Sequence, residues 1–130
     1  MNMNLYTEAQ FEQLLTQGRN RDQDHPPVVK LFTPDANFTW LLSEIDPEEP
    51  DIAFGLCDLG QGFPELGCVS LAELRSIRGK MGLPVERDLS FVAEHPLSVY
   101  AEAARQAEGI IEDSRALLQA AATLATRRDA

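Results

Sequence analysis

Hydrophobic and polar positions near the start of the chain follow the period of a helix. Apolar residues recur at the i, i+3, i+4 spacing of one helix face, at Phe11, Leu14 and Leu15. Thr7 is a favourable N-cap residue and Gly18 a favourable stop, so we predict a helix over residues 6–18. The polar stretch that follows, residues 19–27, ends in two prolines and is predicted to be a loop.

The middle of the chain changes to short apolar or alternating runs bounded by turn residues, which is the pattern of β-strands. Five strands are predicted, over residues 28–32, 38–45, 51–59, 66–69 and 88–92. Because consecutive runs are joined mostly by short turns, we expect antiparallel pairing. Alternate side chains share a face of a strand, so Glu44 is predicted to point outward, opposite to Leu41 and Ile45.

Two more helical regions are predicted between and after the strands. Ser70 and Glu73 have the spacing of a capping box, which predicts a helix beginning at Leu71. After Pro96, alanine-rich sequence with apolar residues at helical spacing predicts either one long helix or two helices joined near Gly109.

These elements together predict an α+β fold class. We expect an antiparallel sheet of about four to five strands with an N-terminal helix, one inserted helix and a long C-terminal helix or helical pair. Residues 1–96 are expected to form an acidic α+β domain. Residues 97–130 are expected to form a helical extension that either packs on this domain or mediates dimerisation through its stripe of small residues.

The charge of the chain is concentrated in one segment. The net charge is −10, and residues 31–74 contain nine carboxylates but no lysine, arginine or histidine. The rest of the chain holds 12 acidic against 11 basic residues, so this segment supplies nine of the ten units of charge. Like charges repel one another, so such a segment either attracts a basic partner or keeps the protein soluble. Both interpretations stay open at the level of the sequence.

The composition also argues against several classes of protein. No run approaches the roughly 18 apolar residues of a membrane span, and the first residues lack the pattern of a secretory signal, so we expect a cytoplasmic protein without membrane contact. Direct binding of nucleic acid requires a basic patch, which the acidic balance disfavours. Cys57 and Cys68 lie in apolar runs and are interpreted as buried thiols rather than zinc ligands. We expect no cofactor.

Several sequence blocks of the central region occur together in one known family. They are Leu31-Phe32, Thr39-Trp40, Asp51–Leu56, Asp58–Gly60, Pro64–Gly67 and Gly82–Asp88. Over roughly residues 28–97 the chain resembles a family of small proteins of unknown function, the domain of unknown function numbered twenty-nine fifty-eight. The resemblance implies an origin on plasmids and integrative elements, near genes of DNA transfer and anti-restriction. It implies no activity and no catalytic residues.

The acidic segment and this resemblance together predict a non-enzymatic acidic binding protein of a mobile element. It would be a counter-defence inhibitor, anti-CRISPR or anti-restriction, that occupies a basic nucleic-acid-binding groove as a DNA mimic. The expected partner is the basic surface of a nucleic-acid-binding defence complex. The predicted contact residues are Glu44, Asp46, Glu48, Glu49 and Asp51, with Asp58 and Glu65 in support.

A metal-dependent nuclease, or a DNA-processing accessory protein of a transfer locus, is the alternative function. Clustered carboxylates can ligate Mg²⁺ through oxygen, and the bound metal can assist hydrolysis. In this hypothesis Asp58, Glu65 and Glu44 would hold the metal and Arg87 would contact phosphate. The negative charge of the chain would repel a nucleic-acid substrate, which counts against the alternative.

Overall fold

The computed structural model describes residues 5–129, and this part of the chain contains one five-stranded antiparallel sheet with helices on both faces. The strand order is β4-β3-β2-β1-β5. The elements are α1 (Glu8–Gly18), β1 (Val29–Phe32), β2 (Thr39–Ile45), β3 (Ile52–Asp58), β4 (Glu65–Ser70), α2 (Leu71–Ser76), β5 (Glu86–Arg87), α3 (Leu97–Ala107) and α4 (Ser114–Asp129). The predicted α+β class is confirmed.

The first helix begins where the sequence predicts a cap, but Gly18 is its last residue rather than a left-handed stop after it, and Arg19 is the C-cap. The Thr7 hydroxyl accepts a hydrogen bond from the Gln10 amide at 3.0 Å, and the Gln10 side chain accepts one from the Thr7 amide at 2.8 Å, which completes a capping box. At the other end, Gly18 packs directly on β2. A Cβ atom at this position would lie 2.0 Å from the Ile45 carbonyl oxygen, so only glycine fits.

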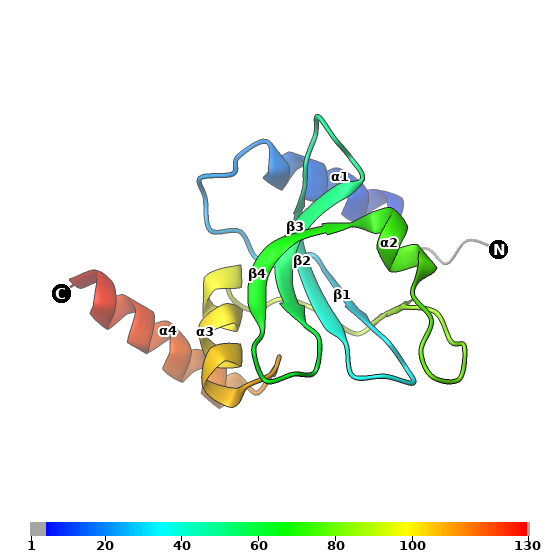
Figure 1. Cartoon of the computed structure of the whole chain (residues 1–130). Helices are drawn as coiled ribbons and strands as arrows, with labels where there is room; N and C mark the ends of the chain where they lie inside the picture. The colour runs from blue at the N-terminus through cyan, green and yellow to red at the C-terminus, as the bar shows by residue number, and fades with distance from the viewer. Residues whose placement is uncertain (1–4, 130) are drawn as a thin grey trace.

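Two apolar clusters lie on opposite faces of the sheet. Helices α1 and α2 contribute to the first cluster, which includes Leu14, Leu31, Trp40 and Leu74. Helix α3 covers the second face, where Leu41 and Leu56 meet Tyr100, and α4 packs behind α3. In Figure 1 the pair α3 and α4 lies to the left of the sheet and α2 lies to its right.

A β-bulge in β2 changes which face Glu44 occupies. The pairing of β2 with β3 skips Ser43, so that Leu42 lies opposite Gly55 and Glu44 lies opposite Phe54. The extra residue turns Glu44 onto the face that α3 covers, where its exposed fraction is 9%. The predicted outward orientation of Glu44 is therefore wrong, because alternation along the strand is interrupted between Leu41 and Glu44.

The fifth strand is shorter and earlier than predicted. Residues 86–87 pair with β1 and the Asp88 amide still donates to the Lys30 carbonyl at 2.9 Å, whereas residues 89–92 leave the sheet. A local turn follows the strand, in which the Asp88 carboxylate accepts a hydrogen bond from the Ser90 amide at 2.8 Å. Leu89, which falls within the predicted strand, is 83% exposed.

The C-terminal region forms two helices, which resolves the choice that the sequence left open. Glu108 adopts a left-handed conformation with φ of 62°, and the Gly109 amide donates to the Ala104 carbonyl at 3.0 Å, which ends α3. Helix α4 then packs on α3 through the buried Leu117 and Ala120. Leu118, on the outer side of α4, is exposed, and a homodimer seam there stays a prediction.

Candidate acidic interface

The carboxylates of the acidic segment are divided between the two ends of β3. Asp46, Glu48, Glu49 and Asp51 lie in the loop before this strand, and Asp58 ends it. A strand of seven residues spans about 20 Å, so the two groups are well separated. The predicted contact residues therefore do not form one cluster.

The loop between β2 and β3 is held in one conformation by its own hydrogen bonds. The Asp46 carboxylate accepts from the Glu48 amide at 2.9 Å, and the Ile52 amide donates to the Glu49 carbonyl at 2.9 Å. Arg21 forms an ion pair with Asp46 at 3.0 Å. Two of the four loop carboxylates, those of Glu48 and Glu49, are exposed and take no part in these bonds.

Asp51 connects this loop to the first turn of α2. Its carboxylate accepts from the Ser70 hydroxyl at 2.6 Å and from the Ala72 amide at 2.9 Å. The hydrogen bond from Ser70, then the one from Ala72, lowers the pKa of Asp51 below its ordinary value, and Arg75 adds to this effect. Asp51 is thus ionised and fixed, although its side chain remains exposed.

The capping box predicted for α2 forms only in part. Ser70 accepts from the Glu73 amide at 3.2 Å, as predicted. The Ser70 hydroxyl in turn donates a hydrogen bond to the Asp51 carboxylate. The Glu73 carboxylate makes no hydrogen bond or ion pair within the described chain. Glu73 therefore joins the exposed carboxylates at this end of the sheet, a role that the sequence did not assign to it.

We refer to Glu48, Glu49, Asp51 and Glu73 as the acidic end. The ion pairs found in residues 5–129 use other carboxylates, namely those of Asp46, Asp88, Glu102 and Glu112. The acidic end thus carries four exposed carboxylates without an ion-pair partner in the described chain. Asp46 lies beside it, with its charge partly balanced by Arg21.

Two of the predicted contact residues are buried instead. Asp58 is 9% exposed, and its two carboxylate oxygens accept from the amides of Gly60 and Ile110, each at 2.9 Å. The second bond ties the end of β3 to the segment between α3 and α4. Burial raises the pKa of Glu44, and His25 and Arg21 partly oppose this effect. Neither carboxylate is placed for contact with a partner's surface.

Glu65, the last of the predicted contact residues, begins β4 and is exposed. It lies opposite Cys57, at the end of β3 that is far from the acidic end. The length of β4 separates it from the other exposed carboxylates of the segment.

The residues proposed for a metal site do not come together. Glu44 lies opposite Phe54, and Asp58 is four residues farther along β3, which corresponds to about 13 Å. Arg87 lies on β5, at the opposite edge of the sheet from Glu65 on β4. Within residues 5–129, no three His, Cys, Asp or Glu side chains are grouped closely enough to hold a metal ion.

The two cysteines occupy different environments. Cys57 is half-buried, and burial raises the pKa of its thiol to about 11. Cys68 is exposed, which corrects the prediction that both thiols are buried. The apolar run around Cys68 forms β4, whose outer side is not covered by another strand of residues 5–129.

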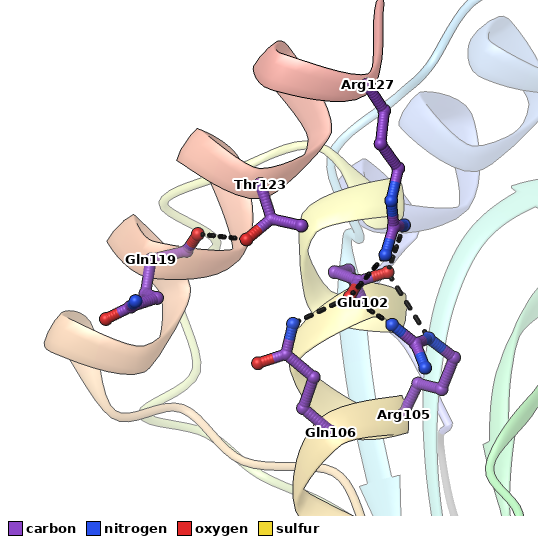
Figure 2. A network of polar contacts seen from close by, with 6 residues as sticks. All are labelled: Glu102, Arg105, Gln106, Gln119, Thr123 and Arg127. Atoms are coloured by element: carbon purple, nitrogen blue, oxygen red, sulfur yellow. Dashed lines mark hydrogen bonds and ion pairs between the residues drawn. The ribbon is translucent and has the colours of Figure 1, made fainter.

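A polar network that the sequence did not reveal joins α3 to α4. Glu102, on α3, is buried and receives hydrogen bonds from Arg105 at 2.5 Å, Gln106 at 2.7 Å and Arg127 at 2.8 Å. Figure 2 shows Arg127 reaching across from α4 to this carboxylate. Arg105, followed by Arg127 and Gln106, holds the pKa of Glu102 at about 2. The i, i+3 spacing of Glu102 and Arg105 was the one signal available in the sequence.

Comparison with protein families identifies the chain by its sequence. It belongs to the family described as "Protein of unknown function (DUF2958)", whose profile matches residues 5–111. The match confirms the resemblance and extends it to α1 and α3, while α4 lies outside it. Comparisons with curated proteins and with solved structures gave no match. In the described residues, no helix is both long and apolar enough to cross a membrane.

Proposed function

We propose that this protein is a non-enzymatic acidic binding protein of a mobile element that inhibits a defence complex, such as a CRISPR effector or a restriction enzyme. The acidic end contacts a basic nucleic-acid-binding groove of that complex and takes the place of DNA. The contact uses Glu48, Glu49, Asp51 and Glu73 together with Asp46. Glu44 and Asp58 support the fold rather than the contact.

The observation that carries this proposal is that the acidic end is exposed and lacks ion-pair partners within the described chain. Carboxylates that repel one another destabilise a protein unless something else offsets the repulsion. Here the carboxylates of Asp46 and Asp51 hold the loop in one conformation, so the positions from which the charges project are set before binding. Preorganised charge of one sign favours fast, salt-sensitive association with a surface of opposite sign.

Affinity capture tests the proposal with the full-length chain as bait and a host that carries intact defence systems. A nucleic-acid-binding complex should be enriched at low salt and released at high salt, because screening weakens charge-matched binding. Added duplex DNA should compete for the same groove and also release the complex. Capture that is insensitive to both salt and DNA would contradict the proposal.

A pair of double variants locates the contact on the surface. Glu48→Gln with Glu49→Gln removes two charges from the acidic end, and Glu8→Gln with Glu12→Gln removes two charges from exposed positions of α1. Both variants have the same net charge. Only the first should lose the complex; equal loss in both would indicate that net charge alone governs binding.

A further inference from the structure

Strand β4 leaves one edge of the sheet without a neighbouring strand in the described chain. The Leu71 amide donates to the Asp51 carbonyl at 2.8 Å. The register of β3 and β4 places these two residues opposite each other, so they form a hydrogen-bonded pair of the ladder. Such pairs alternate along an antiparallel ladder, so Gly67 faces β3 while Leu66 and Cys68 face outward. The amide and carbonyl groups of Leu66 and Cys68 are therefore directed away from the sheet.

This edge lacks the features that usually protect a strand from further pairing. Edges are commonly blunted by short strands, charges, proline or bulges. The opposite edge follows this rule, because β5 has only two residues. Strand β4 has six residues in unbroken register with β3, contains no proline, and carries a charge only at Glu65. Leu66 is 48% exposed and nearby Phe63 is 81% exposed, although both side chains are apolar.

A groove runs beside β4 on the side of the sheet that α2 covers. It has a volume of about 400 Å³, and Trp40, Leu59, Val69, Leu74 and Ile77 line it. Gly67 lies on the same face and leaves open space above the strand, since a Cβ atom there would meet nothing within 4 Å. Glu73 lines the groove, and Glu65 lies on this face at the other end of β4. The groove is thus mostly apolar with one carboxylate, Glu73, in its lining, and Glu65 lies outside it at the other end of the same strand.

We propose that β4 binds an extended basic segment of the partner protein, which adds a sixth strand to the sheet. Backbone pairing uses the outward groups of Leu66 and Cys68. On the α2 side, arginine or lysine side chains lay their aliphatic stems along the groove and place their charges near Glu65 and Glu73. On the opposite side, apolar residues of the segment pack beside Leu66. This inference rests on the proposed function, because it assigns the segment to the same basic partner.

Charge favours a different protein over a second copy of this chain as the occupant. Each copy has a net charge of −10. Antiparallel pairing of two β4 strands would bring Glu65 and Glu73 of both copies onto one face, and β4 itself carries no cation to compensate. Like charges directly across a strand pair destabilise it.

A synthetic peptide of alternating arginine and valine, eight residues long, tests the edge directly. Methyl groups on the amides of one edge of the peptide prevent it from pairing with itself. The peptide should bind the full-length protein saturably and should slow hydrogen exchange at the amides of Leu66 and Cys68. A peptide with the same charge but proline at two central valine positions cannot pair and should not bind. Equal binding of both peptides would overturn the proposal, since charge attraction alone would then suffice.

Two substitutions at Cys68 provide a matched comparison. Cys68→Pro removes an outward amide and leaves the hydrogen bonds to β3 in place, whereas Cys68→Val keeps the amide. The proline variant should bind the arginine–valine peptide about tenfold more weakly than the valine variant. Equal affinities in folded variants would overturn the proposal. If the proline variant does not fold, hydrogen exchange in the wild-type protein is the deciding measurement. Exchange rates at the Leu66 and Cys68 amides that do not change when the peptide is added would overturn the proposal.

Self-association of the protein through β4 is the other outcome that these experiments can detect. Concentration-dependent dimers that protect the amides of Leu66 and Cys68 without peptide would make a second copy the occupant, and the proposal would be wrong. These measurements use only the purified protein and the peptides. Their failure is therefore distinguishable from failure of the proposed function, which the salt-dependent capture and the Glu48 and Glu49 variants test.

Discussion

Carboxylates on the α3 side of the sheet and carboxylates of the acidic end have the same chemistry but opposite surroundings. Asp58 and Glu102 are buried, and each is surrounded by donors from separate parts of the chain. Glu48 and Glu49 are exposed and have no ion pair in the described chain. The first pair holds elements together, whereas the second pair adds charge repulsion without stabilising contacts. The carboxylates of Glu48 and Glu49 are thus the ones that the proposed function assigns to a partner.

Removal of the Asp58 carboxylate should give the largest loss of stability among these residues. Asp58→Ala leaves the amides of Gly60 and Ile110 without their acceptor and should lower the free energy of unfolding by about 3 kcal/mol. Urea denaturation measures this loss. Asp58→Asn is the matched variant, because it retains one carbonyl acceptor and should lose less. Equal stability of the alanine variant and the wild type would show that Asp58 does not anchor the segment between α3 and α4.

Glu102→Gln should have the next largest effect, and its size should depend on pH. The folded-state pKa of about 2 lies below the ordinary 4.5, so ionised Glu102 stabilises the folded state above pH 4.5. This contribution is lost as the pH falls from about 4.5 through about 2. We expect a loss of about 1 kcal/mol at pH 7, reduced because both arginines are largely exposed to solvent. The difference from wild type should shrink between pH 4.5 and 2, as measured by thermal unfolding.

Glu44→Gln should act in the opposite direction. Burial raises the folded-state pKa of Glu44, so ionisation of this group costs stability as the pH rises above its ordinary value of 4.5. Removal of the charge should therefore raise the melting temperature at pH 7 relative to wild type and leave it nearly unchanged at pH 4. A lower melting temperature at pH 7 would mean that His25 and Arg21 outweigh burial.

The sequence predicted the elements better than the placement of individual carboxylates. Local signals were sufficient for the start of α1, since Thr7 and Gln10 cap each other, whereas the need for glycine at position 18 comes from Ile45 on β2. The face of Glu44 depends on the bulge in β2, and the bulge is visible only once β3 is paired against it. The burial of Asp58 likewise depends on Ile110, which is 52 residues away in the sequence. Contacts between distant segments therefore separated the structural carboxylates from the exposed ones.

The smallest effect on stability should come from the acidic end itself. Glu48→Gln with Glu49→Gln breaks no ion pair or side-chain hydrogen bond in the described chain and should change the free energy of unfolding by less than about 0.5 kcal/mol. A small gain is favoured at low salt, because the substitutions relieve repulsion from Asp51 and Glu73. Urea denaturation at low and high salt measures this, and the gain should vanish as salt screens the charges. A substantial loss of stability would mean that the loop carboxylates help to hold the fold. The contrast with Asp58 would then fail, and with it the argument that these charges remain for a partner.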